Sequence, residues 1–427
     1  MTENGNQARP VRTLTVKNFS VIKEAKLEFG KITVLIGPQA SGKSLLCKLA
    51  HFLGSKIIDI GISHVTNRLS FPVFESTVKK EFLNWFPRGG WGGHHFVITF
   101  FSNDYEVTIS GPAEAKLNSE IAVKFAGKIK QEYIDRLAGN ASARYNDDIR
   151  PTSDLLSSLA QLSFRWMSGR GLSDNSIYIP LERSYFVDTK KGYKALASDA
   201  DPISADFAAL FANSLDRNFP SGRLAKFLNG SLGSGPEGWF FSFEDGRELP
   251  LSELSSGSKE TLPILSVLDM FENRIRQPRW DASSSIQVND KTYSYDDFTI
   301  EEPEASVFPR TQYELVKEFA KLANGESFKP HFTITTHSPY ILSVFGDLVK
   351  AGKVGAESPE HRATVSKVIP EQYWINDGDF AAYKIEDKKL VSIYDKKTGQ
   401  IDGDYLDSVS GKISDELGQL LEIQYGG

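Results

Sequence analysis

The sequence lacks the features that mark secreted and membrane-embedded proteins. Its 427 residues include a single cysteine, Cys47, which excludes an internal disulfide and is expected to pack as a small apolar residue. No apolar run approaches the roughly 18 residues that a membrane-spanning helix needs. The opening residues, MTENGNQARP, have no apolar segment typical of a secretion signal. These absences predict a cytoplasmic protein with no membrane partner.

The chain also lacks an excess of positive charge and an internal repeat. Its 49 Lys and Arg residues against 55 Asp and Glu residues give a net charge of −6, so overall charge does not indicate nucleic-acid binding. DNA binding would require a local basic surface. No repeat period of about 20 to 50 residues is present, which excludes repeat architectures. The length is compatible with one large core carrying insertions or with two domains.

An octapeptide, GPQASGKS at positions 37–44, is the most informative segment that is present. It follows the apolar run at 32–36 and precedes helix-prone residues at 45–49, which is the order strand, glycine turn, helix. In such a P-loop, backbone N–H groups surround phosphates, Lys43 reaches the β- and γ-phosphates, and the Ser44 hydroxyl binds Mg²⁺. The predicted ATP-binding residues are therefore Gly37, Pro38, Gln39, Ala40, Ser41, Gly42, Lys43 and Ser44.

A second motif, LSSGSKE at 254–260, precedes an apolar run with helical spacing. A small residue there lets a backbone approach closely, and the N–H groups and dipole of a helix start favour a phosphate. Considered alone, a serine-rich helix cap is an equal alternative, and Pro263 is expected to kink or delay the helix. The segment resembles the LSGGQ signature of ABC-type ATPases. That resemblance adds Ser255 and Gly257 to the ATP-binding residues.

Two apolar strands ending in polar residues complete the resemblance. The segment FTIEEPE at 298–304 resembles a Walker B strand, which implies that Glu301 holds Mg²⁺ in place of the usual aspartate and that Glu302 is the general base. The segment FTITTHSPYIL at 332–342 resembles the strand that carries the switch histidine, here His337. The predicted catalytic residues are Glu302 and His337, and the predicted metal ligands are Ser44 and Glu301.

Together these motifs resemble ABC-type ATPases of the SMC, RecF and OLD-like kind, and the sequences of the motifs are most similar to the AAA15/AAA21 group. The resemblance implies an α/β fold with an ABC-type P-loop core, a mixed sheet with flanking helices, and a mainly helical insertion. The expected segments are an N-terminal part of the core at 1–112, a helical insertion at 113–170, a core strand with a variable insertion at 171–250, and a C-terminal part of the core at 251–427.

Local patterns predict several further elements. Alternating apolar residues indicate strands between 11 and 36 and hairpins at 96–110 and around 240–246, and the run at 177–181 indicates a buried strand. The segment 311–325 is typical of a helix that stops at Gly325. The RGGWGGHH segment at 88–95 is interpreted as a hairpin connection, and the Gly/Ser run at 229–238 as a loop.

The resemblance also implies partners. In such ATPases the P-loop of one subunit faces the signature of another, so a homo-oligomer is expected, either a dimer or a larger ring. Many relatives carry a fused Toprim nuclease, but the acidic pairs Asp377 with Asp379 and Asp402 with Asp404 are more typical of glycine turns. A separate effector, such as a Toprim or other nuclease, is therefore expected.

The sequence resembles the ATPase components of anti-phage defence systems such as PARIS and Septu. This resemblance implies a sensor or scaffold that responds to a phage protein and controls its effector. The alternative is an ATPase that resembles RecF or SMC proteins and binds DNA during repair or genome maintenance.

Overall fold

The structure is a computed structural model. It describes residues 12–102, 105–113, 120–127, 130, 176–188, 201–217, 222–236, 238–276, 297–326, 328–402, 414–421 and 423–424. Most of the predicted insertion at 113–170 lies outside these residues. Within the described part of the chain, no helix is long and apolar enough to cross a bilayer.

One sheet of eleven strands organises the molecule, in the order β6-β5-β4-β1-β2-β14-β13-β3-β12-β11-β7. Its strands are β1 (Arg12–Phe19), β2 (Ile22–Glu28), β3 (Ile32–Ile36), β4 (Phe96–Ser102), β5 (Tyr105–Gly111), β6 (Ala122–Gly127), β7 (Ser176–Ile179), β11 (Asp297–Glu301), β12 (His331–Thr336), β13 (Phe380–Glu386) and β14 (Lys389–Ser392). Two smaller sheets contain β8 (Gly230–Gly235), β9 (Gly238–Phe243) and β10 (Glu248–Pro250), and β15 (Tyr394–Asp395) with β16 (Gln400–Ile401).

The large sheet has a parallel part and an antiparallel part. Strands β13, β3, β12, β11 and β7 are parallel neighbours, whereas β2, β1, β4, β5 and β6 are joined by antiparallel pairs. All five residues of β3 are buried, as expected for a central parallel strand that is covered on both faces. The predicted α/β class with a mixed sheet and flanking helices is confirmed.

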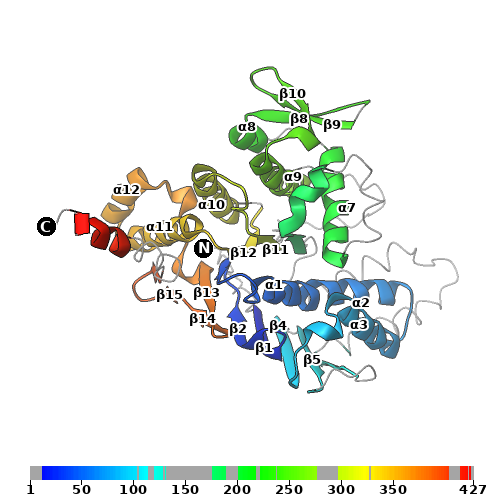
Figure 1. The fold of residues 1–427 in the computed structure, drawn as a ribbon. Coiled ribbons are helices and arrows are strands. Elements are labelled where there is room, and N and C mark those ends of the chain that lie inside the picture. Colours follow the sequence, from blue (N-terminus) through cyan, green and yellow to red (C-terminus); the bar gives the residue numbers. More distant parts are fainter. Residues whose placement is uncertain are drawn as a thin grey trace, which may run out of the picture.

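Helices lie on both faces of the large sheet or pack against helices that do. They are α1 (Lys43–His51), α2 (Ile57–Thr66), α3 (Phe71–Trp85), α6 (Tyr185–Asp188), α7 (Pro202–Arg217), α8 (Gly222–Leu228), α9 (Ser256–Arg276), α10 (Pro309–Ala323), α11 (Pro339–Gly355) and α12 (Pro359–Val368), with a π-helical turn at Phe52–Lys56 between α1 and α2. Figure 1 shows α1, α2 and α3 on the other side of β11 and β12 from α10 and α11.

The two faces carry separate hydrophobic cores. Val34 of β3 belongs to a core built with residues of α7, α9, α10 and α11, whereas its neighbour Leu35 belongs to a core built with residues of α1, α2, α3 and the antiparallel strands. Successive side chains of a strand point to opposite faces, so β3 contributes to both cores. This double burial fixes the position of the P-loop that follows β3.

Three local expectations differ from the structure. The segment at 88–95 connects α3 to β4 and is not a hairpin connection, and it is anchored by the buried Trp91, whose Nε1 donates to the Phe86 carbonyl at 2.7 Å. The Gly/Ser run predicted as a loop forms β8, which pairs with β9 while Phe240 and Phe241 lie against its glycines. Residues 122–127 form β6 against β5, so this part of the predicted helical insertion is a strand.

The remaining local predictions agree with the elements observed. The hairpins are β4 with β5 and β9 with β10, and the buried strand at 177–181 is β7. Helix α10 ends at Ala323, two residues before the predicted stop at Gly325. Pro263 does not break α9, which continues from Ser256 to Arg276.

Candidate active site

Strand register brings three predicted motifs to one edge of the sheet. Strand β12 lies between β3 and β11, with Ile36 opposite Thr336 and Thr335 opposite Glu301. Gly37 follows the end of β3, His337 follows the end of β12, and Glu302 follows the end of β11, so these three residues lie at the same level of the sheet. Because the carboxyl ends of parallel strands meet at the same edge, residues far apart in the sequence become neighbours.

The P-loop turns tightly into α1 at Gly42. This residue has a φ of +108°, and a Cβ there would lie 2.6 Å from Ile22 Cδ1, so only glycine fits. No side chain caps the start of α1. The buried Ser41 hydroxyl has no hydrogen-bond partner among the described residues. Free N–H groups at a helix start and an unsatisfied hydroxyl fit the phosphates of a nucleotide.

The Lys43 side chain lies in the middle of the predicted site and is 5% exposed. Its ammonium donates to the carbonyl oxygens of Gly37 at 2.8 Å and Pro38 at 3.0 Å, and its Nζ lies 2.9 Å from His337 Nε2. Burial lowers the pKa of Lys43, while the carboxylate of Glu302 opposes that shift. The Lys43 ammonium is therefore held by carbonyls of the P-loop, and it would have to leave these carbonyls to contact phosphates.

His337 stands between Lys43 and Glu302. Its Nε2 lies 3.2 Å from Glu302 Oε1, and about a quarter of each of these two side chains is exposed. Burial, together with the charge of Lys43, lowers the pKa of His337, which favours the neutral imidazole. Lys43 and Glu302 both face Nε2: this nitrogen accepts from the Lys43 ammonium when it carries no proton and donates to the Glu302 carboxylate when it does, so the two neighbours favour opposite tautomers.

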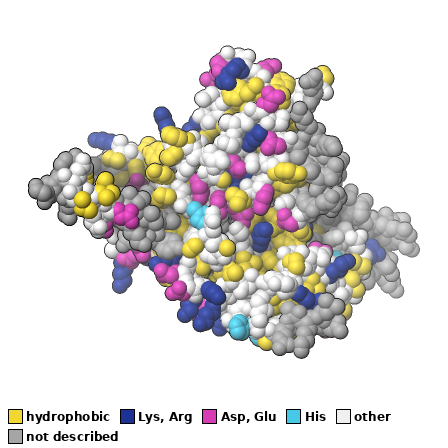
Figure 2. All heavy atoms as spheres, in the orientation of Figure 1, with side chains coloured by type: hydrophobic (Ala, Val, Ile, Leu, Met, Phe, Trp, Pro, Cys, Tyr) yellow, Lys and Arg dark blue, Asp and Glu magenta, His cyan; other side chains and the backbone are white. Residues whose placement is uncertain are grey.

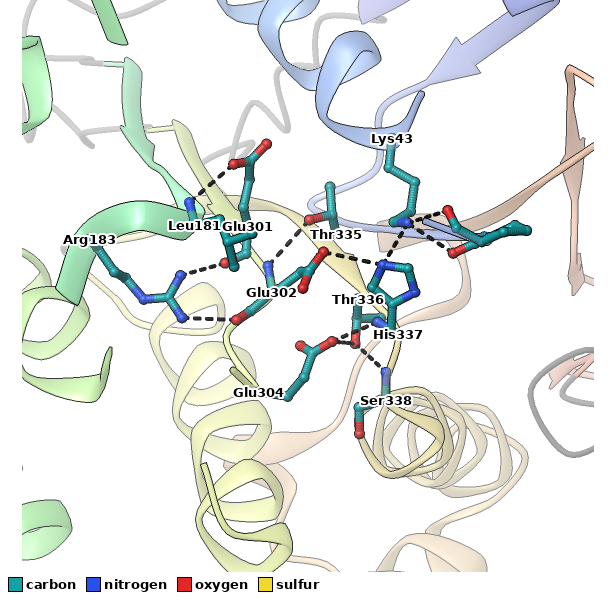
Figure 3. Close-up of polar contacts among 12 residues, drawn as sticks. Lys43, Leu181, Arg183, Glu301, Glu302, Glu304, Thr335, Thr336, His337 and Ser338 are labelled. Carbon is teal, nitrogen blue, oxygen red and sulfur yellow. Dashed lines mark hydrogen bonds and ion pairs between the residues drawn. The ribbon is translucent and has the colours of Figure 1, made fainter. Parts of the chain in front are cut away.

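Glu302 has an unusual backbone conformation. Its φ is +40°, a region that costs a non-glycine residue about 1–3 kcal/mol unless surrounding contacts hold it. Its N–H donates to the Thr335 carbonyl at 2.9 Å, and its own carbonyl accepts from Arg183 at 2.8 Å. Figure 3 shows the Arg183 contact and a further contact of the Glu302 N–H, with the Thr335 hydroxyl at 3.3 Å. Together with the Thr335 carbonyl, these contacts fix the direction in which the Glu302 carboxylate leaves the strand.

The carboxylate of Glu301 is directed elsewhere. It accepts from the hydroxyl of Tyr178 on β7 at 2.7 Å and from the Leu181 N–H at 3.1 Å. Figure 3 shows the Leu181 contact, with the Glu301 carboxylate directed away from Lys43. Burial raises the pKa of Tyr178, so its hydroxyl remains a donor. Both Glu301 oxygens are engaged by protein groups, which disfavours direct contact with a metal, and the role of Glu301 in holding Mg²⁺ through water stays a prediction.

Ser44 fits the metal role better. It lies in the first turn of α1 directly after Lys43 and is partly exposed. Among the residues that the structure describes, no group of three or more His, Cys, Asp or Glu side chains is arranged to hold a metal ion by itself. A magnesium ion here would therefore depend on the phosphates of a bound nucleotide for most of its ligands.

Glu304 contributes to the site although the sequence interpretation gave it no role. Its Oε1 accepts from the backbone N–H of His337 at 2.6 Å and from the Thr336 hydroxyl at 2.8 Å. Burial raises its pKa, and hydrogen bonds from these donors oppose that shift. The sequence signal was the third acid of the IEEPE segment, which follows the paired glutamates after one proline.

Ser255 and Gly257 lie at the start of α9, with local contacts. The Ser255 Oγ accepts from the Ser258 N–H at 3.3 Å and so caps the helix. A Cβ on Gly257 would lie 2.9 Å from the carbonyl oxygen of Ser306, in the loop after the acids, so glycine permits that close approach. The structure therefore places His337 in contact with both Lys43 and Glu302, while Ser255 and Gly257 contact other residues.

Comparison with known proteins supports an ATPase. Residues 184–342 match the family described as AAA ATPase domain, AAA_15. The match contains the signature, the acids and His337, but it does not include the P-loop. No curated protein matches the chain.

Solved structures that match this chain include three SMC heads. The SMC head domain from Thermotoga maritima is 11% identical, with 79% of this chain and 92% of that chain covered and a TM-score of 0.34. The SmcHead bound to the C-winged helix domain of ScpA is 12% identical, with coverages of 90% and 97% and a TM-score of 0.41. The Smc head domain bound to the C-terminal domain of ScpA derived from Pyrococcus furiosus is 14% identical, with coverages of 90% and 96% and a TM-score of 0.38.

Proposed function

We propose that the protein binds and hydrolyses ATP at the P-loop, with Glu302 orienting the attacking water and His337 contacting the γ-phosphate. The observation that carries this proposal is the contact of Lys43 with His337 and of His337 with Glu302, at the ends of three adjacent strands. Phosphoryl transfer to water needs positioning and charge stabilisation, and a cation, an imidazole and a carboxylate at one edge supply both.

The P-loop residues bind the triphosphate in this proposal. Lys43 leaves the Gly37 and Pro38 carbonyls for the β- and γ-phosphates, and the Ser41 hydroxyl gains an acceptor. The Ser44 hydroxyl would be the protein ligand of Mg²⁺, and the ion would supply positive charge that neutralises the phosphates. Glu302 then accepts a hydrogen bond from the water, and neutral His337 donates or accepts according to which nitrogen carries its proton.

We further propose that hydrolysis requires two copies of the chain, with Ser255 and Gly257 of one copy facing the nucleotide of the other. The support is the exposed start of α9, where the Ser255 hydroxyl caps the Ser258 N–H and lies beside helix-start N–H groups suited to a phosphate. Mixing two inactive variants tests this arrangement. Ser255→Asp keeps a helix cap but places a negative charge where the phosphate would lie, and Lys43→Ala removes the P-loop lysine.

Each variant alone should lose most turnover. An equimolar mixture should recover up to about a quarter of wild-type activity, because one of the two sites in a mixed dimer contains an intact P-loop and an intact signature. Ser255→Asn, which caps the helix without charge, is the matched control and should remain active. A mixture as inactive as its components would place the signature in the same chain's site, or remove it from the reaction.

We propose that the ATPase acts in the cytoplasm as a sensor and scaffold that controls a separate effector in anti-phage defence, the effector being a nuclease. This proposal rests on the sequence resemblance of the IEEPEAS and THSPYIL segments to such ATPases. The test is purification of tagged Glu302→Gln protein, expressed with its neighbouring genes, followed by identification of bound proteins and the mass of the assembly. A stoichiometric nuclease is expected, and its loss should abolish protection against phage.

DNA binding is the competing outcome of the same purification. An ATPase dimer that carries DNA and no second protein would favour a role resembling RecF or SMC proteins. The face in Figure 2 has acidic side chains gathered near its middle and Lys and Arg side chains scattered around them, which is a poor match to a DNA backbone. A DNA affinity that is low and that changes little with salt would agree with the defence proposal.

A further inference from the structure

Arg183 lies outside the ATP-binding motifs, yet it is among the largest fully buried side chains. It follows β7 in a short 3₁₀-helix, Leu181–Ser184. Its Nη1 donates to the Glu301 carbonyl at 2.6 Å and its Nη2 to the Glu302 carbonyl at 2.8 Å. A fully buried cation costs free energy unless it is paired and hydrogen-bonded. The guanidinium of Arg183 therefore depends on the acceptors around it, and they are held in place together with it.

The other side of the guanidinium contacts helix α9. Arg183 Nε donates to the Glu260 carbonyl at 3.0 Å, and its Nη2 forms an ion pair with the Glu260 carboxylate at 3.0 Å. Glu260 lies just over one helical turn after Ser255, at the start of the same helix. One planar side chain therefore links the signature helix to the backbone of both acids, which Figure 3 shows for Glu301 and Glu302.

The link acts where the backbone is strained. Glu302 has a φ of +40°, and its N–H and carbonyl are held by Thr335 on β12 and by Arg183. The Glu302 carbonyl also accepts from the Ala305 N–H at 3.0 Å, so Arg183 supplies one of its two hydrogen bonds. Losing the Arg183 bond would weaken the hold on this conformation and let the carboxylate turn away from His337. Gly257 adds a second contact between α9 and the acid loop, because its close approach to Ser306 would be prevented by any side chain.

We infer that Arg183 is a positioning residue that couples the placement of the signature helix α9 to the orientation of the Glu302 carboxylate. The inference deepens the proposed ATPase function and rests on it. When Ser255 contacts a partner's nucleotide, α9 shifts. The shift is transmitted through Glu260 and Arg183 to the Glu302 carbonyl. Hydrolysis then responds to the state of the signature without a direct contact between the signature and the acid.

The test uses Arg183→Lys, with Arg223→Lys as the matched control. Lysine keeps the charge but cannot donate to several acceptors in one plane. Arg223 is also largely buried and pairs with Asp269, Glu272 and Glu318, which come from α9 and α10 and not from the acid loop. Both variants should lower the melting temperature, so the control measures the cost of shortening a buried arginine.

The expected difference lies in turnover. For Arg183→Lys we expect kcat to fall about tenfold or more while the Kd for ATP stays within about twofold, because the P-loop is unchanged. Arg223→Lys should keep kcat within about twofold when corrected for the folded fraction. The inference is overturned if the two variants have the same kcat, or if Arg183→Lys loses ATP affinity in proportion to its loss of kcat.

Glu260→Gln tests the helix side of the link. It removes the charge while leaving the Glu260 carbonyl in place, so we expect a smaller loss of kcat than for Arg183→Lys. The double variant should be no worse than about twofold below Arg183→Lys alone, because both changes break the same connection. Multiplied losses in the double variant would show that the two residues act independently and would overturn the coupling.

A structural readout separates this inference from the ATPase proposal. If the wild-type protein binds ATP but does not hydrolyse it, the proposed function fails, and amide hydrogen exchange at Glu302 then tests the coupling directly. Arg183→Lys should exchange this amide faster than Arg223→Lys, because the strained turn opens locally. Equal exchange rates in the two variants would overturn the inference.

Discussion

The Lys43 ammonium lies 2.9 Å from Nε2 of His337, on the adjacent strand end, and both are next to the carboxylate of Glu302. This relationship places the cation of the P-loop directly against the predicted switch histidine. ATP binding must replace the contacts of Lys43 with His337 and with two loop carbonyls. Nucleotide binding and release of the histidine are therefore expected to be one event.

Glu302→Gln should retain ATP binding and lose turnover by roughly 100-fold or more, because the amide cannot act as a base toward water. Phosphate release and nucleotide affinity measured on the same preparation check this expectation. Glu248→Gln, an exposed position on β10, is the control and should keep its turnover. Unchanged turnover in Glu302→Gln would exclude Glu302 as the base.

Two substitutions of Glu304 should behave differently. Glu304→Gln keeps an oxygen that can accept from the His337 N–H and the Thr336 hydroxyl, so most turnover should remain. Glu304→Ala leaves these buried donors without their acceptor, which costs about 1–3 kcal/mol and releases the backbone of His337. Thermal unfolding and turnover should therefore both fall for alanine, and equal effects of the two variants would contradict this view.

Stability should depend on pH through His337. Because burial lowers its pKa, the unfolded chain takes up a proton as the pH falls through the ordinary value near 6.5, while the folded protein resists it. The free energy of unfolding should therefore decrease between pH 8 and pH 5.5. His337→Gln lacks this titration, so its melting temperature should fall less over the same range, measured without nucleotide.

Part of the pH dependence should remain in that variant. Burial also lowers the pKa of His64, which contributes with the same sign. A His337→Gln protein whose melting temperature falls as much as that of the wild type would show that His337 titrates in the folded state as it does in the unfolded chain.

The only cysteine offers a simple measure of opening at the site. Cys47 lies in α1 with no exposed surface, and burial raises its thiol pKa, with Glu301 adding to the shift. A disulfide reagent at pH 8 should react with the native protein at least about 100-fold more slowly than with denatured protein. ATP should slow the reaction further in the wild type but not in Lys43→Ala. Rapid reaction of native protein would contradict the burial of α1.

Much of the site could be predicted from local patterns. The strand, glycine turn and helix around Lys43, and the apolar strands before Glu302 and His337, each show in short stretches of sequence because strands and helices have distinct periodicities. The chemistry of those residues also follows from their types. Buried Cys47 behaves as the sequence indicated, as a small apolar residue in the core.

Other features depend on contacts between distant segments. The direction of Glu301 is set by Tyr178 of β7 and by Leu181 just after it, more than a hundred residues earlier in the chain. A pair of adjacent acids in the sequence gives no sign of this direction. In the sequence, Arg183 is recognisable only as a charged residue that follows a strand. Its contacts with α9 and with the acid loop depend on where those two segments lie in the fold. The strand at 230–235 was missed because glycine disfavours strands locally, whereas here pairing with β9 determines the conformation.

The order of strands around the P-loop has a consequence for synthesis of the chain. Strand β3 ends at Ile36, but its neighbours β12 and β13 begin at His331 and Phe380. Until those segments have left the ribosome, the strand that leads into the P-loop has no partner on either side. A prematurely terminated chain would expose two unpaired edges of a strongly apolar strand, which favours aggregation. Nucleotide-binding capacity should therefore arise only after β12 and β13, which ends at Glu386, have been made.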